Sequence, residues 1–127
     1  MKKKALMSIV LLIIGASAVF AQTINGVWRG PSGGIISIYD GKGVWTEVND
    51  KNWKEAEKRG NVGIGALAFR SIKSAGNLTW TGQTSTVNNR TYAVSWGGNV
   101  TFTVSPDGRT MQAKYQDGGS GTWTRIQ

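Results

Sequence analysis

The sequence predicts an all-β fold, namely an antiparallel up-and-down β-barrel of about eight strands with one short helix. Short runs with apolar residues at every second position follow one another at near-even spacing, and glycine-rich or Asp-Gly turns separate them. Gly26-Val27-Trp28 lies near one end of this region and Arg125 near the other. If the first and last strands pair, the sheet loses both open edges and Arg125 can lie on the indole of Trp28.

Residues 1–21 have the pattern of a secretory signal peptide. Three lysines precede an apolar run at 6–14 that is too short to span a bilayer, and small residues end the segment. Cleavage is expected before Gln22, or else after Ala18. We therefore expect an exported protein, periplasmic or secreted, with no transmembrane segment after cleavage.

Residues 22–127 are predicted to form a single β-barrel domain. Removing 21 of 127 residues leaves 106, and removing three lysines from 15 basic residues leaves 12 against 7 acidic ones, a net charge of +5. The basic residues are scattered singly, so nucleic acid is not expected as a partner. The sequence has no cysteine, and its six tryptophans provide large pieces for the core instead of disulfides.

The first half of the domain is predicted to hold three strands, at residues 24–29, 35–39 and 44–48. The glycine-rich loop 30–34 separates the first two strands, and the tight-turn sequence 40–43 makes the second and third a hairpin.

Residues 49–61 break the β pattern and predict a short helix. Asn49 or Asp50 suits its N-cap, and Gly60 suits the position after its C-terminus. Trp53 is its only large apolar residue, and it could anchor the helix over one end of the barrel or rest on the outer wall. A solvated connector is the simpler interpretation, and a functional lid is the alternative.

The second half is predicted to hold a strand at 62–69, a hairpin within 71–82 that turns at 73–77, and further strands at 87–96, 100–104, 111–115 and 121–126. Turns at Gly97-Gly98, 105–108 and 117–119 separate the later strands.

These residues resemble the calycin superfamily, the lipocalin-like barrels, through Gly26-x-Trp28 on the first strand and Arg125 on the last. The resemblance implies a closed barrel that encloses a small apolar ligand. It also implies that Trp28 and Arg125 are structural residues of barrel closure.

Most of the domain also resembles a family of uncharacterised exported bacterial proteins, predicted to be small β-barrels, within that superfamily. The chain departs from the family at 84–90, where the family has an Asp-Pro turn and a Gly-Lys pair. The resemblance implies fold and export and supplies no catalytic residue. The matching residues are Gly26-Val27-Trp28, Ile38-Tyr39, Gly41, Gly63-Ile64, Ile72-Lys73, Trp80-x-Gly82, Tyr92, Asp107-Gly108 and Trp123-Thr124-Arg125-Ile126.

Little in the chain is suited to catalysis. Histidine and cysteine are absent, so the usual general bases, thiolate nucleophiles and soft metal ligands are missing. Asp40, Asp107 and Asp117 each precede a glycine, where the carboxylate is expected to cap its own turn. We therefore expect no enzymatic activity, no cofactor and no metal site.

Aromatic residues in the middle of strands, together with one acid, are the candidate ligand-binding residues: Trp45, Glu47, Trp80, Tyr92 and Trp96. Glu47 alternates with Trp45, so it is a polar contact for a ligand if this face points inward and an ordinary strand charge if it points outward. Packing of the aromatics into a filled core is the alternative.

Two functions follow from these alternatives. The first is an exported small binding protein that holds a small apolar ligand in its barrel. The second is an envelope protein-protein interaction factor or inhibitor that uses rim loops such as 30–34 on a filled barrel. Neither the identity of a ligand nor the oligomeric state follows from the sequence.

Overall fold

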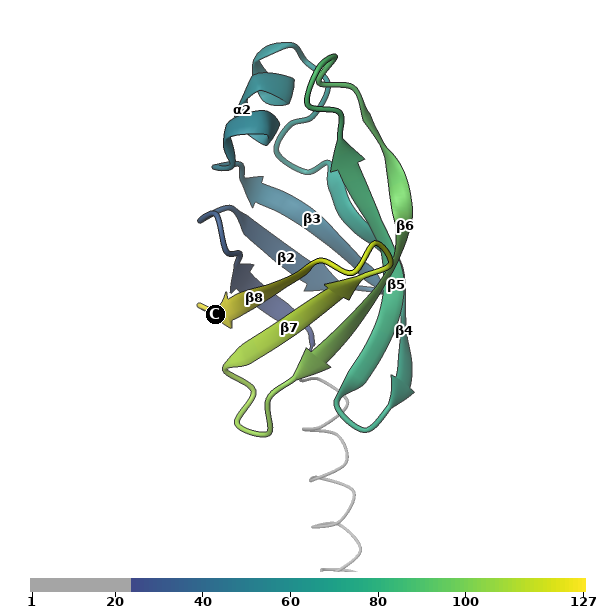
Figure 1. Ribbon diagram of the computed structural model, residues 1–127. Coiled ribbons are helices and arrows are strands. Elements are labelled where there is room, and N and C mark those ends of the chain that lie inside the picture. The colour runs from purple at the N-terminus through teal and green to yellow at the C-terminus, as the bar shows by residue number, and fades with distance from the viewer. Residues whose placement is uncertain (1–23) are drawn as a thin grey trace, which may run out of the picture.

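The computed structural model describes residues 24–127, which form a closed antiparallel barrel (Figure 1). Each strand pairs with the next in sequence, and the last pairs back with the first, so the predicted fold class is confirmed. The expected signal peptide, 1–21, lies outside the described residues. The strands are β1 (Gly26–Arg29), β2 (Ile35–Tyr39), β3 (Lys42–Glu47), β4 (Leu67–Gly76), β5 (Thr79–Val87), β6 (Val94–Val104), β7 (Thr110–Tyr115) and β8 (Ser120–Arg125).

One helix, α2 (Lys51–Lys58), interrupts the sheet between β3 and β4 and lies at one end of the barrel (Figure 1). Asp50 is its N-cap, and its carboxylate accepts hydrogen bonds from the backbone N–H groups of Asn52 and Trp53. Gly60 follows the C-cap with a φ of +78°, which glycine adopts without strain. No helix in residues 24–127 is long and apolar enough to cross a membrane.

The predicted contact between Arg125 and Trp28 is confirmed, and it joins β8 to β1. The two residues are cross-strand partners, and the guanidinium carbon lies 4.3 Å from the centre of the Trp28 ring. The same guanidinium donates hydrogen bonds from Nε to the Gly108 carbonyl (2.6 Å) and from Nη1 to the Asn25 carbonyl (2.7 Å). Burial lowers the pKa of Arg125 from its usual value, as expected for a contact that is partly removed from water.

Gly26 is required by this closure. Its φ is +147°, and a Cβ atom there would collide with Nη1 of Arg125 and lie 2.8 Å from the carbonyl oxygen of Gln127. The pairing of β1 with the C-terminus continues past β8, because the Val27 N–H donates to the Gln127 carbonyl (2.7 Å) and the Ile126 N–H donates to the Val27 carbonyl (2.9 Å).

The interior beside this closure is packed with apolar side chains. The predicted alternation at Val100, Phe102 and Val104 is confirmed, since all three are buried on one face of β6. The largest side chains with an exposed fraction of at most 2% are Trp28, Ile36, Ile38, Phe102 and Met111. The core of the barrel beside the closure is therefore built from buried apolar side chains.

The prediction of a strand at 62–69 is wrong for residues 62–66. Residues 62–66 form a turn in which the Ala66 N–H donates to the Gly63 carbonyl (3.0 Å), and Gly65 has a φ of +89°. Strand β4 starts only at Leu67 and continues to Gly76, where the sequence predicted a turn at 73–77. The chain reverses instead at Asn77-Leu78, where Leu78 has a φ of +53°.

The strand predicted at 87–96 is also displaced. Asn88 closes a loop across residues 88–93, because its N–H donates to the Ala93 carbonyl and its side chain accepts from the N–H groups of Arg90 and Thr91. Strand β6 begins after this loop and continues through Gly97-Gly98, where a turn was expected and where a β-bulge lies instead.

Replacing Arg125 with alanine should destabilise the barrel by about 2 kcal/mol, since the change removes a cation–π contact and two charged hydrogen bonds. Unfolding in urea, followed by tryptophan fluorescence, should show a lower midpoint with an unchanged slope. Arg90→Ala, which truncates an exposed arginine in the loop 88–93, is the matched control. Equal midpoints for the two variants would contradict the role given to Arg125.

Candidate functional site

The loops of an up-and-down barrel alternate between its two ends. The turns β2–β3, β4–β5 and β6–β7 share one end with Arg125, which we call the base. The loop 30–34, the segment 48–66 with α2, and the loops 88–93 and 116–119 share the other, which we call the mouth. A cavity of about 350 Å³ lies at the mouth, bounded by parts of the first two segments and of the last one.

Five aromatic residues line the cavity: Trp45, Trp53, Phe69, Tyr115 and Trp123. Phe69 marks its floor, because its ring meets the Trp123 ring edge-on at 5.8 Å and the fully buried Phe102 ring at 4.9 Å. Trp53 comes from α2, and its ring centre lies 5.2 Å from that of Trp45. Trp53 therefore anchors the helix over one end of the barrel, one of the two positions predicted for it.

The glycine-rich loop 30–34 forms part of the wall because two of its glycines permit a close approach. A Cβ atom at Gly30 would lie 2.7 Å from the Trp123 ring, and one at Gly34 would lie 2.9 Å from the Trp45 ring. The backbone of the loop thus rests directly on both indoles.

Two indole N–H groups have no hydrogen-bond partner in the described part of the chain. They belong to Trp45 and Trp123, whose exposed fractions are 8% and 5%, and both residues line the cavity. Burial raises the pKa of the nearby Tyr115 hydroxyl; the Trp123 indole counteracts this rise, and the charge of Asp117 adds to it. The Trp123 N–H is thus near that hydroxyl, but no hydrogen bond of standard geometry joins the two groups.

The buried hydroxyl groups of the wall are already occupied. Thr84 Oγ1 donates to the Ser85 carbonyl (3.1 Å), and Ser85 Oγ donates to the Ala68 carbonyl (3.0 Å). The charges that line the cavity are acidic, since Asp50 and Asp117 belong to its described lining and no lysine or arginine does. Within residues 24–127, no group of three acidic side chains is placed to hold a metal ion.

Of the five predicted ligand-binding residues, the structure places Trp45 in the cavity wall and the other four elsewhere. Trp80 is buried toward the base, where it pairs with Phe102 across β5 and β6. Tyr92 lies in the loop 88–93, and Glu47 is exposed at the end of β3.

Trp96 is 37% exposed on the outer face, with the Arg70 guanidinium 4.0 Å from its ring centre. β-Bulges explain the outward positions of Trp96 and Glu47. Thr84 and Ser85 pair with Gly98 and Trp96, so Gly97 is an extra residue and the alternation along β6 shifts by one. Thr46 is extra in the same way, which turns Glu47 away from the face that holds Trp45.

Sequence reasoning missed Phe69, Tyr115 and Asp50 as cavity residues and assigned Trp123 only to the closing strand. The glycine-rich loop 30–34 was the one signal that pointed to Trp123. Such a loop allows its backbone to approach an aromatic ring closely, and the backbone at Gly30 lies against the Trp123 ring. Phe69 had no such signal, since its place at the floor depends on how β4 pairs with β3.

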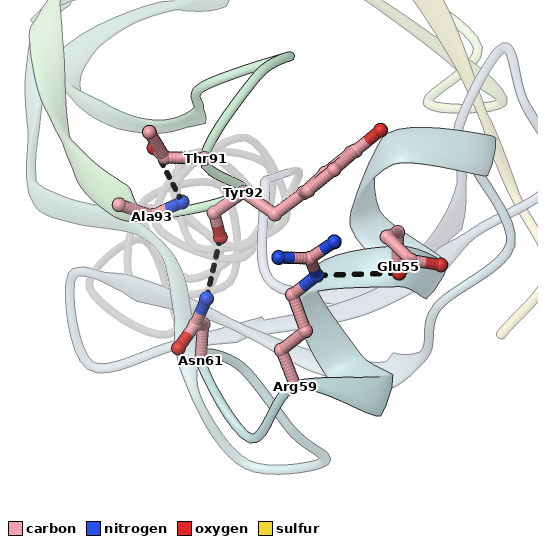
Figure 2. Close-up of polar contacts among 6 residues, drawn as sticks. All are labelled: Glu55, Arg59, Asn61, Thr91, Tyr92 and Ala93. Atoms are coloured by element: carbon pink, nitrogen blue, oxygen red, sulfur yellow. Dashed lines mark hydrogen bonds and ion pairs between the residues drawn. The ribbon is translucent and has the colours of Figure 1, made fainter.

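Helix α2 is fastened to the mouth by its C-terminal end (Figure 2). The Arg59 guanidinium lies 4.6 Å from the centre of the Tyr92 ring, and its Nε donates to the Glu55 carboxylate at 3.2 Å. Asn61 Nδ2 donates to the Tyr92 carbonyl at 2.7 Å. At the other end of α2, Ser32 Oγ donates to the Asp50 carboxylate at 3.4 Å. The helix is therefore connected to two different loops of the mouth.

Comparisons of the chain with family models, with curated proteins and with solved structures gave no match. The resemblance to the lipocalin-like barrels therefore stays a prediction from the residues.

Replacing Asp50 with alanine should loosen α2 while the barrel remains folded. The change removes the N-cap, which is worth about 1 kcal/mol, so hydrogen exchange at the amides of residues 54–58 should become about fivefold faster. Asp107→Ala removes an aspartate that accepts from the Arg109 N–H in a turn at the base, and it should leave these amides unchanged. Wild-type exchange in Asp50→Ala would show that the cap does not hold the helix.

Proposed function

We propose that this protein binds a small, mainly apolar ligand in the cavity at the mouth of its barrel. The observation that carries the proposal is the cavity of about 350 Å³ with its five aromatic lining residues, above a core of buried apolar side chains. Ligand sites have volumes of about 300 Å³ and above, with mostly apolar walls and a few polar groups. The sequence contains neither histidine nor cysteine, which supports binding and not catalysis as the role of this cavity.

A ligand in the cavity is favoured over a protein partner at the rim. The loop 30–34 is pressed onto two indoles, so its glycines serve the wall of the cavity. None of the large exposed apolar side chains in the described residues belongs to the rim loop 30–34; they are Tyr39, Ile64, Leu67, Trp96 and Ile126. A loop that binds a protein partner would be expected to present such side chains.

The proposal extends to family and location. The closure by Gly26, Trp28 and Arg125 supports a relationship to the lipocalin-like barrels. The leader pattern in residues 1–21 supports export to the periplasm or the medium.

Replacing Trp53 with alanine should weaken the binding of a neutral apolar probe, N-phenyl-1-naphthylamine, about tenfold. The change removes an aromatic wall of the cavity and its contact with Trp45, an effect of about 1 to 1.5 kcal/mol. Titration of the probe fluorescence gives the dissociation constant of each variant.

Trp96→Ala is the matched control, because it removes an indole of equal size from the outer face. Its dissociation constant should equal that of the wild type. Native mass spectrometry of the protein from its own cells should also detect a bound small molecule. Failure of the probe to bind, with no molecule bound to the native protein, would contradict the proposed function.

A further inference from the structure

We infer that the ligand of this cavity carries a hydroxyl group, which binds to a polar wall formed by Thr86, Tyr115 and Gln116 beside the β-bulge at Gly97. This inference rests on the proposed function and specifies the class of ligand as an apolar alcohol. Two features lead to it: the division of the lining into apolar and polar parts, and the side chains that the bulge leaves accessible.

The lining of the cavity divides by element into an apolar and a polar part. Strands β3, β4 and β8 and helix α2 provide the apolar rings, which are those of Trp45, Trp53, Phe69 and Trp123. The polar wall comes from β5, from the last residue of β7 and from the loop that follows it. A ligand that touches both parts therefore needs an apolar body and a polar group.

The bulge gives Thr86 its place in the polar wall. Gly97 is the extra residue of the bulge and lines the cavity. A Cβ atom at Gly97 would collide with Cγ2 of Thr86 and lie 3.0 Å from its Oγ1, so the Thr86 side chain lies across the glycine. Thr86 is exposed, and its hydroxyl has no hydrogen-bond partner among residues 24–127. This hydroxyl can therefore donate to a ligand or accept from one.

Gln116 is held beside the next residue of the same strand. Its Oε1 accepts from the Asn99 N–H (3.1 Å), and its backbone N–H donates to the Asn99 carbonyl (3.0 Å). A Cβ atom at Gly98 would lie 2.9 Å from the same Oε1, so the amide rests on the backbone next to Gly97. The Nε2 group has no partner in the described chain, and its two N–H donors are left for a ligand acceptor.

The hydroxyl of Tyr115 is the third available group, since no hydrogen bond of standard geometry joins it to the described residues. Asn99 precedes the buried Val100 on β6, so alternation directs its side chain to the outer face. The remaining polar side chains of the lining already make hydrogen bonds within the protein; they belong to Ser32, Asp50, Thr84, Ser85 and Asp117.

A hydroxyl group suits this combination of donors and acceptors. Gln116 Nε2 can only donate, whereas the hydroxyls of Thr86 and Tyr115 can donate or accept. A ligand hydroxyl can accept from Gln116 and donate to one of the two protein hydroxyls at the same time. A keto oxygen can only accept, so it forms fewer of these hydrogen bonds.

Three probes of matched size test this assignment: 1-(2-naphthyl)ethanol, 2-acetylnaphthalene and 2-isopropylnaphthalene. The second has a keto oxygen in place of the hydroxyl, and the third has a methyl group there. Isothermal titration calorimetry with the purified wild-type protein should give a dissociation constant about fivefold lower for the alcohol than for the ketone. The third probe measures the apolar contacts alone.

Thr86→Val, Tyr115→Phe and Gln116→Met each remove one polar group of the wall with little change of shape. At least one of them should raise the dissociation constant of the alcohol about fivefold, with that of 2-isopropylnaphthalene within about twofold of wild type. Thr101→Val is the matched control, because it removes a hydroxyl from the exposed outer face of β6. It should leave both constants unchanged.

Proton–nitrogen NMR of the wild type provides a test that needs no variant, because the side-chain amide of Gln116 gives its own signals. These signals should move further with the alcohol than with 2-isopropylnaphthalene. Equal movement, binding of the ketone as tight as that of the alcohol, or unchanged alcohol binding in all three variants would overturn the inference while leaving ligand binding intact. If N-phenyl-1-naphthylamine binds and none of these three probes does, the inference alone fails. If none of the four binds, the proposed function fails, and the inference fails with it.

Discussion

The contact between the Arg125 guanidinium and the Trp28 indole is the constraint on which the rest of the barrel depends. It pairs the last strand with the first, and its hydrogen bonds add the Gly108 and Asn25 carbonyls to the same cation. A barrel of eight strands has an interior just wide enough for side chains. Arg125 closes the barrel at the base, and buried apolar side chains occupy the interior beside it. The cavity lies at the opposite end, at the mouth.

The residues that line the cavity at the mouth lower the stability of the fold. Each unpaired indole N–H, at Trp45 and at Trp123, costs about 1–3 kcal/mol, which is a large part of the 5–15 kcal/mol that usually holds a domain folded. Both indoles are held by glycine backbone on one side, at Gly34 and Gly30, so they cannot turn freely toward another acceptor.

The parts of the fold that depend on regular geometry could be predicted from the sequence. Alternation identified the buried face at Val100, Phe102 and Val104, and the residues of the closure followed from the need to pair the sheet edges. The candidate site depends on irregular geometry and was predicted only at Trp45. Period-two reasoning fails at a β-bulge, because one extra residue moves every following side chain to the other face.

The same bulges explain why there is a cavity. Regular alternation along β6 would have placed the Trp96 indole on the inner face, level with the mouth, where it would have filled the space. The extra residue is Gly97, which has no side chain and lines the cavity, while Trp96 lies outside against Arg70. The bulge at Thr46 likewise keeps the Glu47 carboxylate out of the interior. The irregularity that misled the sequence prediction is therefore what leaves the cavity open.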